Sequence, residues 1–469
     1  MKEAYRILPV WAGDVSGIAS ALYELGGMVV IHDPSGCNST YNTHDEIRWY
    51  DQESYIFLSG LNMRDAVLGN DKKFIDDIVE AFYQLDPHPR FIAVCNSPVP
   101  YLTGTDFKAI CRIVESRCHV RTFYVPSNGM YDYVHGAGLA FLQYAKNMLP
   151  ERRQPDQEKD TGRIRVSILG ATPLTYGNRR TVPSLRRLLE KDGFEVVSVW
   201  AMGSSPEEIE RSICTDVNLV ISDTGLPAAE YLRQHYGIPC VTGAPVPGRA
   251  RTRILRDLRA AARPGGGKTW QTDRMDGYAA WPHAQEDSGQ NIDTYRCISM
   301  QSDIKRNEKQ NKKHGITKDR AGIFIGEAVL AKSLAADWDG KAYVLCPFPD
   351  SRKLLDKESG QWYFDGEEEL LSLIRSIRAE DPKAETEIFA DPMYGLVLPE
   401  DVKMHPLPAL AASGRMYQAH FPDYFAESEA GLVPGEQGIS AGRKAGLAPG
   451  EQGISAGNGA DRGETDDER

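Results

Sequence analysis

The 469-residue sequence has no long hydrophobic run and no closely spaced pair of cysteines. A membrane-spanning helix needs about 20 consecutive apolar residues, and no stretch approaches that length. The apolar part of the N-terminus is too short for a signal peptide. The eight cysteines are scattered without a CxxC motif, which fits reduced thiols better than a disulfide framework. The sequence therefore predicts a cytoplasmic protein that does not enter a membrane.

Positive charge and nucleotide-binding loops are also scarce. The formal net charge of −12 argues against a nucleic-acid partner. The segment "GGGKT" is not a P-loop, because Ala262 stands where the first glycine should be, five positions before Gly267, and no buried strand leads directly into it. Bulky side chains are almost missing from residues 427–469, which contain two 13-residue copies that differ at one position. We expect this repeat tail to be disordered.

Strand and helix patterns alternate through most of the chain, which predicts an α/β fold of three Rossmann-like parallel-sheet domains. We expect a first α/β domain at residues 1–150 and a second at 163–261. A polar connection or insertion at 262–320 separates the second from a third α/β domain at 321–426. The strand ending "VSILG" places Gly170 at a turn, where it could also approach a phosphate.

The stretch from Met28 to Asp51 is the chemical centre of the first domain. Its apolar start suits a strand buried on both faces, and the following "DPSG" cannot continue that strand. Cys37 is thereby expected on a loop at the carboxyl end of the sheet, where open α/β sheets hold ligands. Five further polar residues lie in the same stretch: His32, Asp33, His44, Asp45 and Glu46. The pattern leaves two interpretations open, a metal or redox site and a purely structural cysteine.

A second strand of the same kind, "RFIAVC", brings Cys95 to a neighbouring turn, "NSPVPYLTGTD". Thr105 or Asp106 is expected to cap the following helix, "FKAICRIVE". The free backbone donors at the start of that helix would favour an anion or a cluster sulfur nearby.

Four segments in this order resemble the nitrogenase component 1 family, which includes nitrogenase subunits, their assembly scaffolds and tetrapyrrole reductases. They are "GGMVVIHDPSGCNSTY", "PVPYLTGTDFKAI", "VSILGATP" and "LPALAASGRMYQ", and the resemblance spans about residues 8–425. Within the family the chain looks closest to nitrogenase-like proteins rather than to nitrogenase itself. The resemblance implies a [4Fe-4S] cluster at a subunit interface, with the loop residues Gly36 and Cys37 at the cofactor and with Cys37 and Cys95 as candidate metal ligands.

The sequence departs from the family pattern at three places. Ala19 is the nearest match to the first cluster cysteine, and Pro98 stands where the third one belongs, with Cys95 three residues early. Asp33 is a non-cysteine alternative as the companion of Cys37. The strand that anchors the nitrogenase cofactor through a cysteine ends here in Ser222, a much poorer ligand for soft iron-sulfur chemistry, so no FeMo-type cofactor is expected.

The resemblance implies an oxidoreductase catalytic component that takes electrons from a separate ATP-dependent iron-sulfur reductase and reduces an unidentified small molecule. It would act as a homodimer or as a heterodimer with a homologous subunit. Proton delivery or substrate anchoring would fall to His32, Asp33, His44, Asp45 and Glu46. The alternative interpretation is that these side chains form hydrogen bonds within the loop itself. The alternatives are a non-catalytic scaffold for a cluster or metallocofactor precursor, and a metal-free member that kept only the fold.

Overall fold

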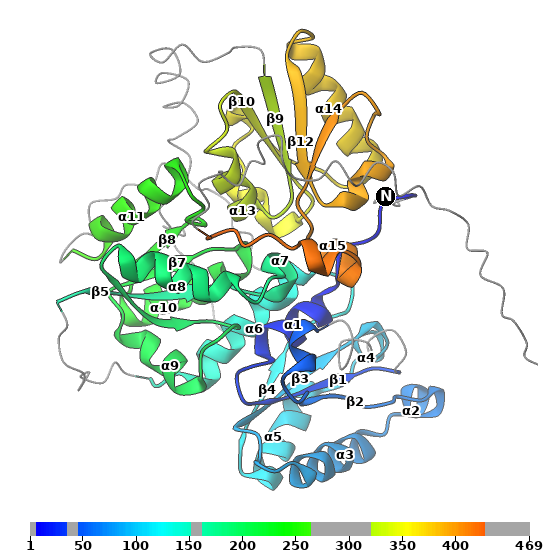
Figure 1. Ribbon diagram of the computed structural model, residues 1–469. Helices are drawn as coiled ribbons and strands as arrows, with labels where there is room; N and C mark the ends of the chain where they lie inside the picture. Colours follow the sequence, from blue (N-terminus) through cyan, green and yellow to red (C-terminus); the bar gives the residue numbers. More distant parts are fainter. Residues whose placement is uncertain (1–5, 35–45, 152–161, 264–319, 427–469) are drawn as a thin grey trace, which may run out of the picture. The chain divides into compact units, whose positions relative to one another are not determined.

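The computed structural model describes residues 6–34, 46–151, 162–263 and 320–426. All of the described residues belong to one compact unit, Met1–Ser428. This unit contains three sheets, and every pair of neighbouring strands in them is parallel. This confirms the predicted three-sheet α/β architecture (Figure 1). The predicted repeat tail and most of the predicted connection at 262–320 lie outside the described residues.

The first sheet has the order β2-β1-β3-β4. Its strands are β1 (Met28–His32), β2 (Ile56–Leu58), β3 (Phe91–Asn96) and β4 (Arg121–Val125). Helices α1 (Asp14–Leu22) and α6 (Tyr133–Met148) pack on one face, and α3 (Asp71–Gln84) and α5 (Phe107–Cys118) on the other (Figure 1). Because both faces are covered, β1 and β3 are fully buried, and each is apolar up to a polar last residue, His32 in β1 and Asn96 in β3. The connections after β2 and β3 hold two short helices, α2 (Met63–Leu68) and α4 (Pro98–Thr103).

Two glycines let α1 and α6 approach each other at backbone distance. A Cβ atom added at Gly136 would lie 1.9 Å from the carbonyl oxygen of Asp14, and one at Gly17 would lie 2.2 Å from that of Tyr133. Helix α6 begins at Tyr133, because Asp132 Oδ1 accepts the backbone N–H groups of Val134 and His135. The two helices therefore cover this face of the first sheet as one closely packed pair.

The second sheet has the order β6-β5-β7-β8. Its strands are β5 (Ile164–Leu169), β6 (Phe194–Val199), β7 (Val217–Val220) and β8 (Cys240–Thr242); its helices are α7 (Pro173–Tyr176), α8 (Thr181–Lys191), α9 (Pro206–Glu210), α10 (Leu226–Tyr236) and α11 (Arg249–Ala261). Gly170 has a φ of +90°, and a Cβ there would lie 3.0 Å from the Ser222 carbonyl oxygen. The turn after β5 therefore needs glycine for conformation and for space.

The third sheet has the order β11-β10-β9-β12-β13. Its strands are β9 (Arg320–Ile325), β10 (Lys341–Cys346), β11 (Gln361–Tyr363), β12 (Glu385–Ala390) and β13 (Lys403–Pro406); its helices are α13 (Ala328–Ala335), α14 (Glu367–Glu380) and α15 (Leu410–Ser413). The N-terminal segment also packs here, since Leu8 belongs to the core of this sheet and Glu367 accepts its backbone N–H. The first described residues of the chain therefore pack against its third sheet.

Candidate functional site

His32 is the last residue of β1 and lies at the carboxyl edge of the first sheet. Its side chain is buried, its Nδ1 lies 2.7 Å from Ser59 Oγ, and its ring stacks on Phe74 with centroids 3.9 Å apart. Burial lowers the pKa of His32 to about 4, although the charge of Asp33 acts in the opposite direction. The imidazole is therefore neutral at neutral pH.

Asp33 is buried beside His32, and the same serine fixes both residues. The Asp33 backbone N–H donates to Ser59 Oγ at 3.1 Å, and the hydroxyl lies 3.3 Å from the Asp33 carbonyl oxygen. Leu61 N–H donates to that carbonyl at 2.8 Å. Ser59 follows β2 as an isolated serine in an otherwise apolar and glycine-containing stretch, and sequence reasoning did not single it out.

Glu46 is held in a buried ion pair. Its Oε1 lies 2.7 Å from Arg48 Nε and its Oε2 lies 2.8 Å from Arg48 Nη2. Arg48 also donates to the carbonyl oxygens of Ser20 and Ala201, each at 2.6 Å. Since Ala201 follows β6 and Ser20 lies in α1, this arginine joins the first and second sheets. These contacts give Glu46 a structural role. Its role in proton delivery stays a prediction.

Cys95 lies within β3 and points into the hydrophobic core rather than onto the following turn. It pairs with Ile31 of β1 and Val125 of β4 and has no exposed surface. Burial raises the pKa of its thiol well above the usual range, so the group is not a thiolate at neutral pH. Ala19, the match to the first cluster cysteine, is buried in the same core.

Pro98 is the first residue of α4, and its ring packs against Gly129. Within the described part of the chain, the edge of the first sheet therefore offers no thiolate, and its donor set does not fit a four-thiolate cluster. No group of three or more His, Cys, Asp or Glu residues suited to a metal ion occurs among the described residues. Gly36, Cys37, His44 and Asp45 lie outside the described residues.

A groove of about 650 Å³ opens beside His32. This volume lies within the range of about 300 to 1,000 Å³ that small-molecule sites have. The charged side chains in its wall are mainly acidic, with four aspartates and one lysine. They are Asp65, Asp71, Asp77, Asp106 and Lys73.

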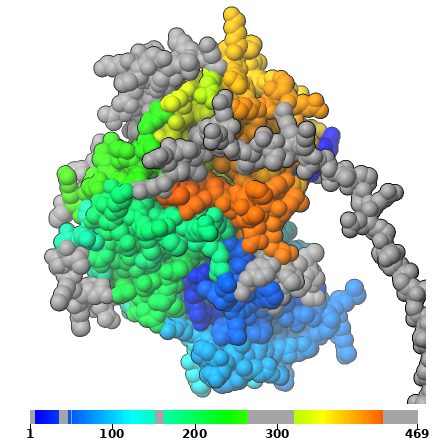
Figure 2. Space-filling view, in the orientation of Figure 1, coloured from blue at the N-terminus to red at the C-terminus, as the bar shows by residue number. Residues whose placement is uncertain are grey.

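The rim of this groove carries exposed apolar side chains. None of the six residues of α2 is buried, and Met63, Val67 and Leu68 are between 72 and 85% exposed. Leu102 of the neighbouring α4 is 77% exposed. We call these four residues the apolar rim; α2 lies at the outer end of the first sheet in Figure 1, and the corresponding blue segment protrudes in Figure 2. Exposed apolar clusters of this kind mark protein-protein or ligand contacts.

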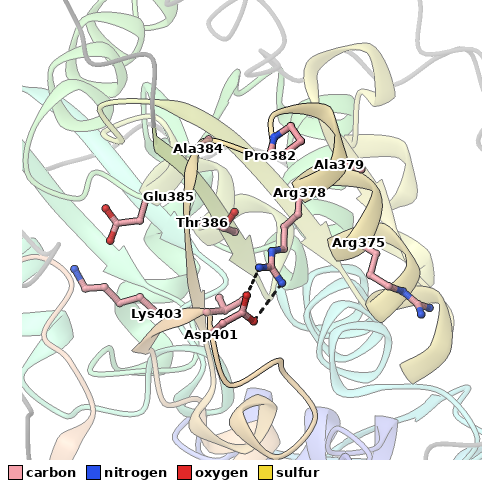
Figure 3. Close-up of a pocket in the computed structure, with 10 residues that line it drawn as sticks. Arg375, Arg378, Ala379, Pro382, Ala384, Glu385, Thr386, Asp401 and Lys403 are labelled. Atoms are coloured by element: carbon pink, nitrogen blue, oxygen red, sulfur yellow. Dashed lines mark hydrogen bonds and ion pairs between the residues drawn. The ribbon is translucent and has the colours of Figure 1, made fainter.

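A second groove, of about 470 Å³, lies between α14 and the start of β12 and β13. Figure 3 shows Arg378 of α14 joined to Asp401, with Lys403 and Glu385 at the beginnings of their strands. Ligands of open α/β sheets bind at the carboxyl ends of the strands. This groove lies at the amino ends, so the edge near His32 remains the stronger candidate.

Ser222, the expected match to the cofactor cysteine of nitrogenase, lies two residues beyond the end of β7. Its side chain is buried, and its Oγ accepts the Thr224 hydroxyl at 3.0 Å and the Thr224 backbone N–H at 3.3 Å. The Ser222 side chain therefore stabilises the turn in which it lies. The next residue, Asp223, is buried against Glu327 of the third sheet, a pair that sequence reasoning missed.

Three parallel sheets joined in one α/β unit define the structural class of this chain. The family model of nitrogenase component 1 type oxidoreductases matches residues 23–297, which is more than half of the sequence. The chain therefore belongs to the nitrogenase component 1 type oxidoreductase family. A solved structure titled "Nitrogenase Cp1 at pH 5" superimposes with a TM-score of 0.53 over 87% of this chain and 85% of that one. At 14% identity this likeness shows the fold alone.

Curated relatives include subunits B of light-independent protochlorophyllide reductase. The protein of Roseiflexus sp. (strain RS-1) is 27% identical over 172 residues, covering 36% of this chain and 29% of the relative. That of Halorhodospira halophila (strain DSM 244 / SL1) is 33% identical over 118 residues, covering 24% and 22%. The match thus spans less than a third of either relative. Within the described ranges, no helix has the length and apolar composition needed to cross a bilayer.

Proposed function

We propose that this chain is the electron-accepting component of a nitrogenase-like oxidoreductase, which takes electrons from a separate ATP-dependent iron-sulfur reductase and reduces a small molecule. Family membership and relatives named as reductase subunits support this proposal. The observation that carries it is the apolar rim beside the His32 groove. A component that receives electrons must meet its donor repeatedly, and α2 and α4 offer such a contact at the edge where the candidate site lies.

The reductase would dock on the apolar rim with a basic contact region. The rim supplies apolar area, while the four aspartates in the groove wall outnumber its single lysine. Complementary charge speeds encounter and fixes orientation more than it adds affinity. Transient electron-transfer contacts are small, commonly below about 1,200 Å², and a rim of four side chains suits a contact of that class.

The redox centre of the proposal rests on Cys37, which lies outside the described residues. We keep the proposal of a [4Fe-4S] cluster shared by two subunits, homodimeric or paired with a homologue. Since Cys95 is buried in the core, any further ligand of the same chain would come from outside the described residues or from a non-cysteine group such as Asp33. Proton transfer or substrate anchoring beside the loop would fall to His32 and Asp33, because Glu46 is committed to Arg48.

A non-catalytic scaffold for a cluster or metallocofactor precursor is the second candidate, and it would share the fold and the His32 groove without accepting electrons. Mixing the oxygen-free protein with a reduced ATP-dependent iron-sulfur reductase from the same host distinguishes the two. We expect the reductase to be oxidised when MgATP and this chain are both present, and to stay reduced with MgADP. A reductase that stays reduced in every mixture would favour the scaffold.

A further inference from the structure

Two carboxyl groups meet in the buried contact between the second and third sheets. Asp223 begins a 3-10 turn after β7, and Glu327 is the N-cap of α13 after β9. Each residue is 5% exposed, although they are 104 positions apart in sequence. The two residues are in direct contact, because Glu327 Oε1 accepts the Asp223 backbone N–H, and their carboxyl groups accept from the consecutive residues Val329 and Leu330 of α13.

Every oxygen of the pair also receives a hydrogen bond. The Asp223 backbone N–H donates to Glu327 Oε1, and Leu330 N–H donates to Glu327 Oε2 at 2.8 Å. In return, Val329 N–H donates to Asp223 Oδ1 at 3.1 Å, and the Ser351 hydroxyl donates to Asp223 Oδ2. The pair therefore ties β7, α13 and the turn after β10 together through reciprocal bonds.

Two negative charges cannot be accommodated in this place. The N-terminus of α13 and the four donors stabilise one carboxylate, but two ionised groups in contact, away from water, repel strongly. Burial, followed by the charge of Asp223, raises the pKa of Glu327 well above its usual value. Lys353 is the cation whose charge acts on Asp223, and burial lowers its own pKa to about 7.

Further titratable groups act on the pair or line the cavity beside it. Burial raises the pKa values of the neighbouring tyrosines and cysteine, so these groups are neutral at neutral pH. Asp391 lies across a cavity of about 40 Å³ that Glu327 also lines, and burial raises its pKa as well. These neighbours are Tyr133, Tyr176, Tyr424, Cys346 and Asp391.

We propose that Asp223 and Glu327 share one proton in the folded chain, and that this proton is a condition of the contact between the second and third sheets. Glu327 carries the proton and still accepts the Asp223 backbone N–H through Oε1. The contact between the second and third sheets is then pH-sensitive, because it weakens when the proton is lost. The proposal does not depend on the redox function.

The test compares the pH dependence of thermal unfolding between pH 6 and 9 in three proteins. A group whose pKa is raised on folding contributes stability that is lost as pH rises through the folded value. Glu327→Gln mimics the protonated form, but its single carbonyl oxygen cannot accept both the Asp223 and the Leu330 backbone N–H, so it lowers the melting temperature at every pH while flattening the alkaline slope. Glu367→Gln is the matched control. Despite burial, the backbone N–H groups of Leu8 and Ile7 lower the pKa of Glu367, so its loss leaves the slope above pH 6 unchanged.

Infrared difference spectra at pH 7 give a second readout of the shared proton. We expect one protonated-carboxyl band in the wild type that disappears in Glu327→Gln and remains in Glu367→Gln. Should Glu327→Gln fail to fold, Asp223→Asn serves instead, because removing the neighbouring charge should shift the loss of that band to lower pH. Identical alkaline slopes in wild type and Glu327→Gln, or a band that neither substitution alters, would overturn the proposal.

Discussion

Arg48 donates hydrogen bonds to both carboxyl oxygens of Glu46 at 2.7 and 2.8 Å, and this ion pair lies inside the protein rather than on its surface. The two side chains are 2 and 6% exposed. The arginine also reaches the backbone of Ser20 and Ala201, so the end of the candidate loop is anchored to two sheets.

Replacing Arg48 with methionine should lower the free energy of unfolding by about 3 to 5 kcal/mol, because Glu46 would remain buried without its partner. Urea unfolding monitored by tryptophan fluorescence measures the loss. Asp76→Asn is the matched control, since Asp76 pairs with Lys72 and Arg117 on the surface. An exposed pair of this kind contributes about 0 to 1 kcal/mol. Equal effects of the two substitutions would contradict the structural role of the buried pair.

His32 should make the protein sensitive to acid. Its folded pKa of about 4 lies below the usual 6.5, so the stability it contributes is present above pH 6.5 and is lost as pH falls toward 4. The shift corresponds to at most about 3 kcal/mol. His32→Gln, which can still bond Ser59, should flatten the acid limb of the melting-temperature profile. His420→Gln, at an exposed position, should leave that limb unchanged.

The two candidate ligand cysteines should behave differently when each is replaced by serine. We expect oxygen-free reconstituted protein to lose its iron in Cys37→Ser and to keep it in Cys95→Ser. The second substitution should instead cost about 1 to 3 kcal/mol of stability, because it places a hydroxyl in an apolar core. Iron and sulfide analysis with urea unfolding separates these effects. Loss of iron in both variants would show that Cys95 is a ligand. Wild-type protein that holds no iron would contradict the cluster proposal.

Long periodic elements could be predicted from the sequence. The spacing of Phe74, Ile75, Ile78, Val79 and Phe82 predicts the inward face of α3, and all five are buried. Asp106, one of two proposed caps, accepts the Ala109 N–H at 3.0 Å. Such features depend on neighbours within a few residues, and local patterns report them well.

Short helices and long-range pairs escaped prediction for physical reasons. Helix α4 has six residues, two of them proline, which is too short for a helical period to appear. The carboxyls of Asp223 and Glu327 meet only because two different sheets pack together. Likewise, "RFIAVC" correctly predicts a strand, but the sequence does not show that the Cys95 side chain faces the core.

The exposed position of Val67 on α2 allows the most direct test of the proposed function. The measurement is the rate of ATP-dependent electron transfer from the iron-sulfur reductase to this chain, in wild type and in Val67→Lys. Val67 is 76% exposed, so an ammonium group there leaves the fold intact while placing water and a charge that repels a basic partner in the apolar rim. Met416→Lys, at a 69% exposed position of the third domain, is the control. The account predicts at least a tenfold slower transfer in Val67→Lys with unchanged melting temperature, and a wild-type rate in Met416→Lys. Equal rates in all three proteins would contradict it.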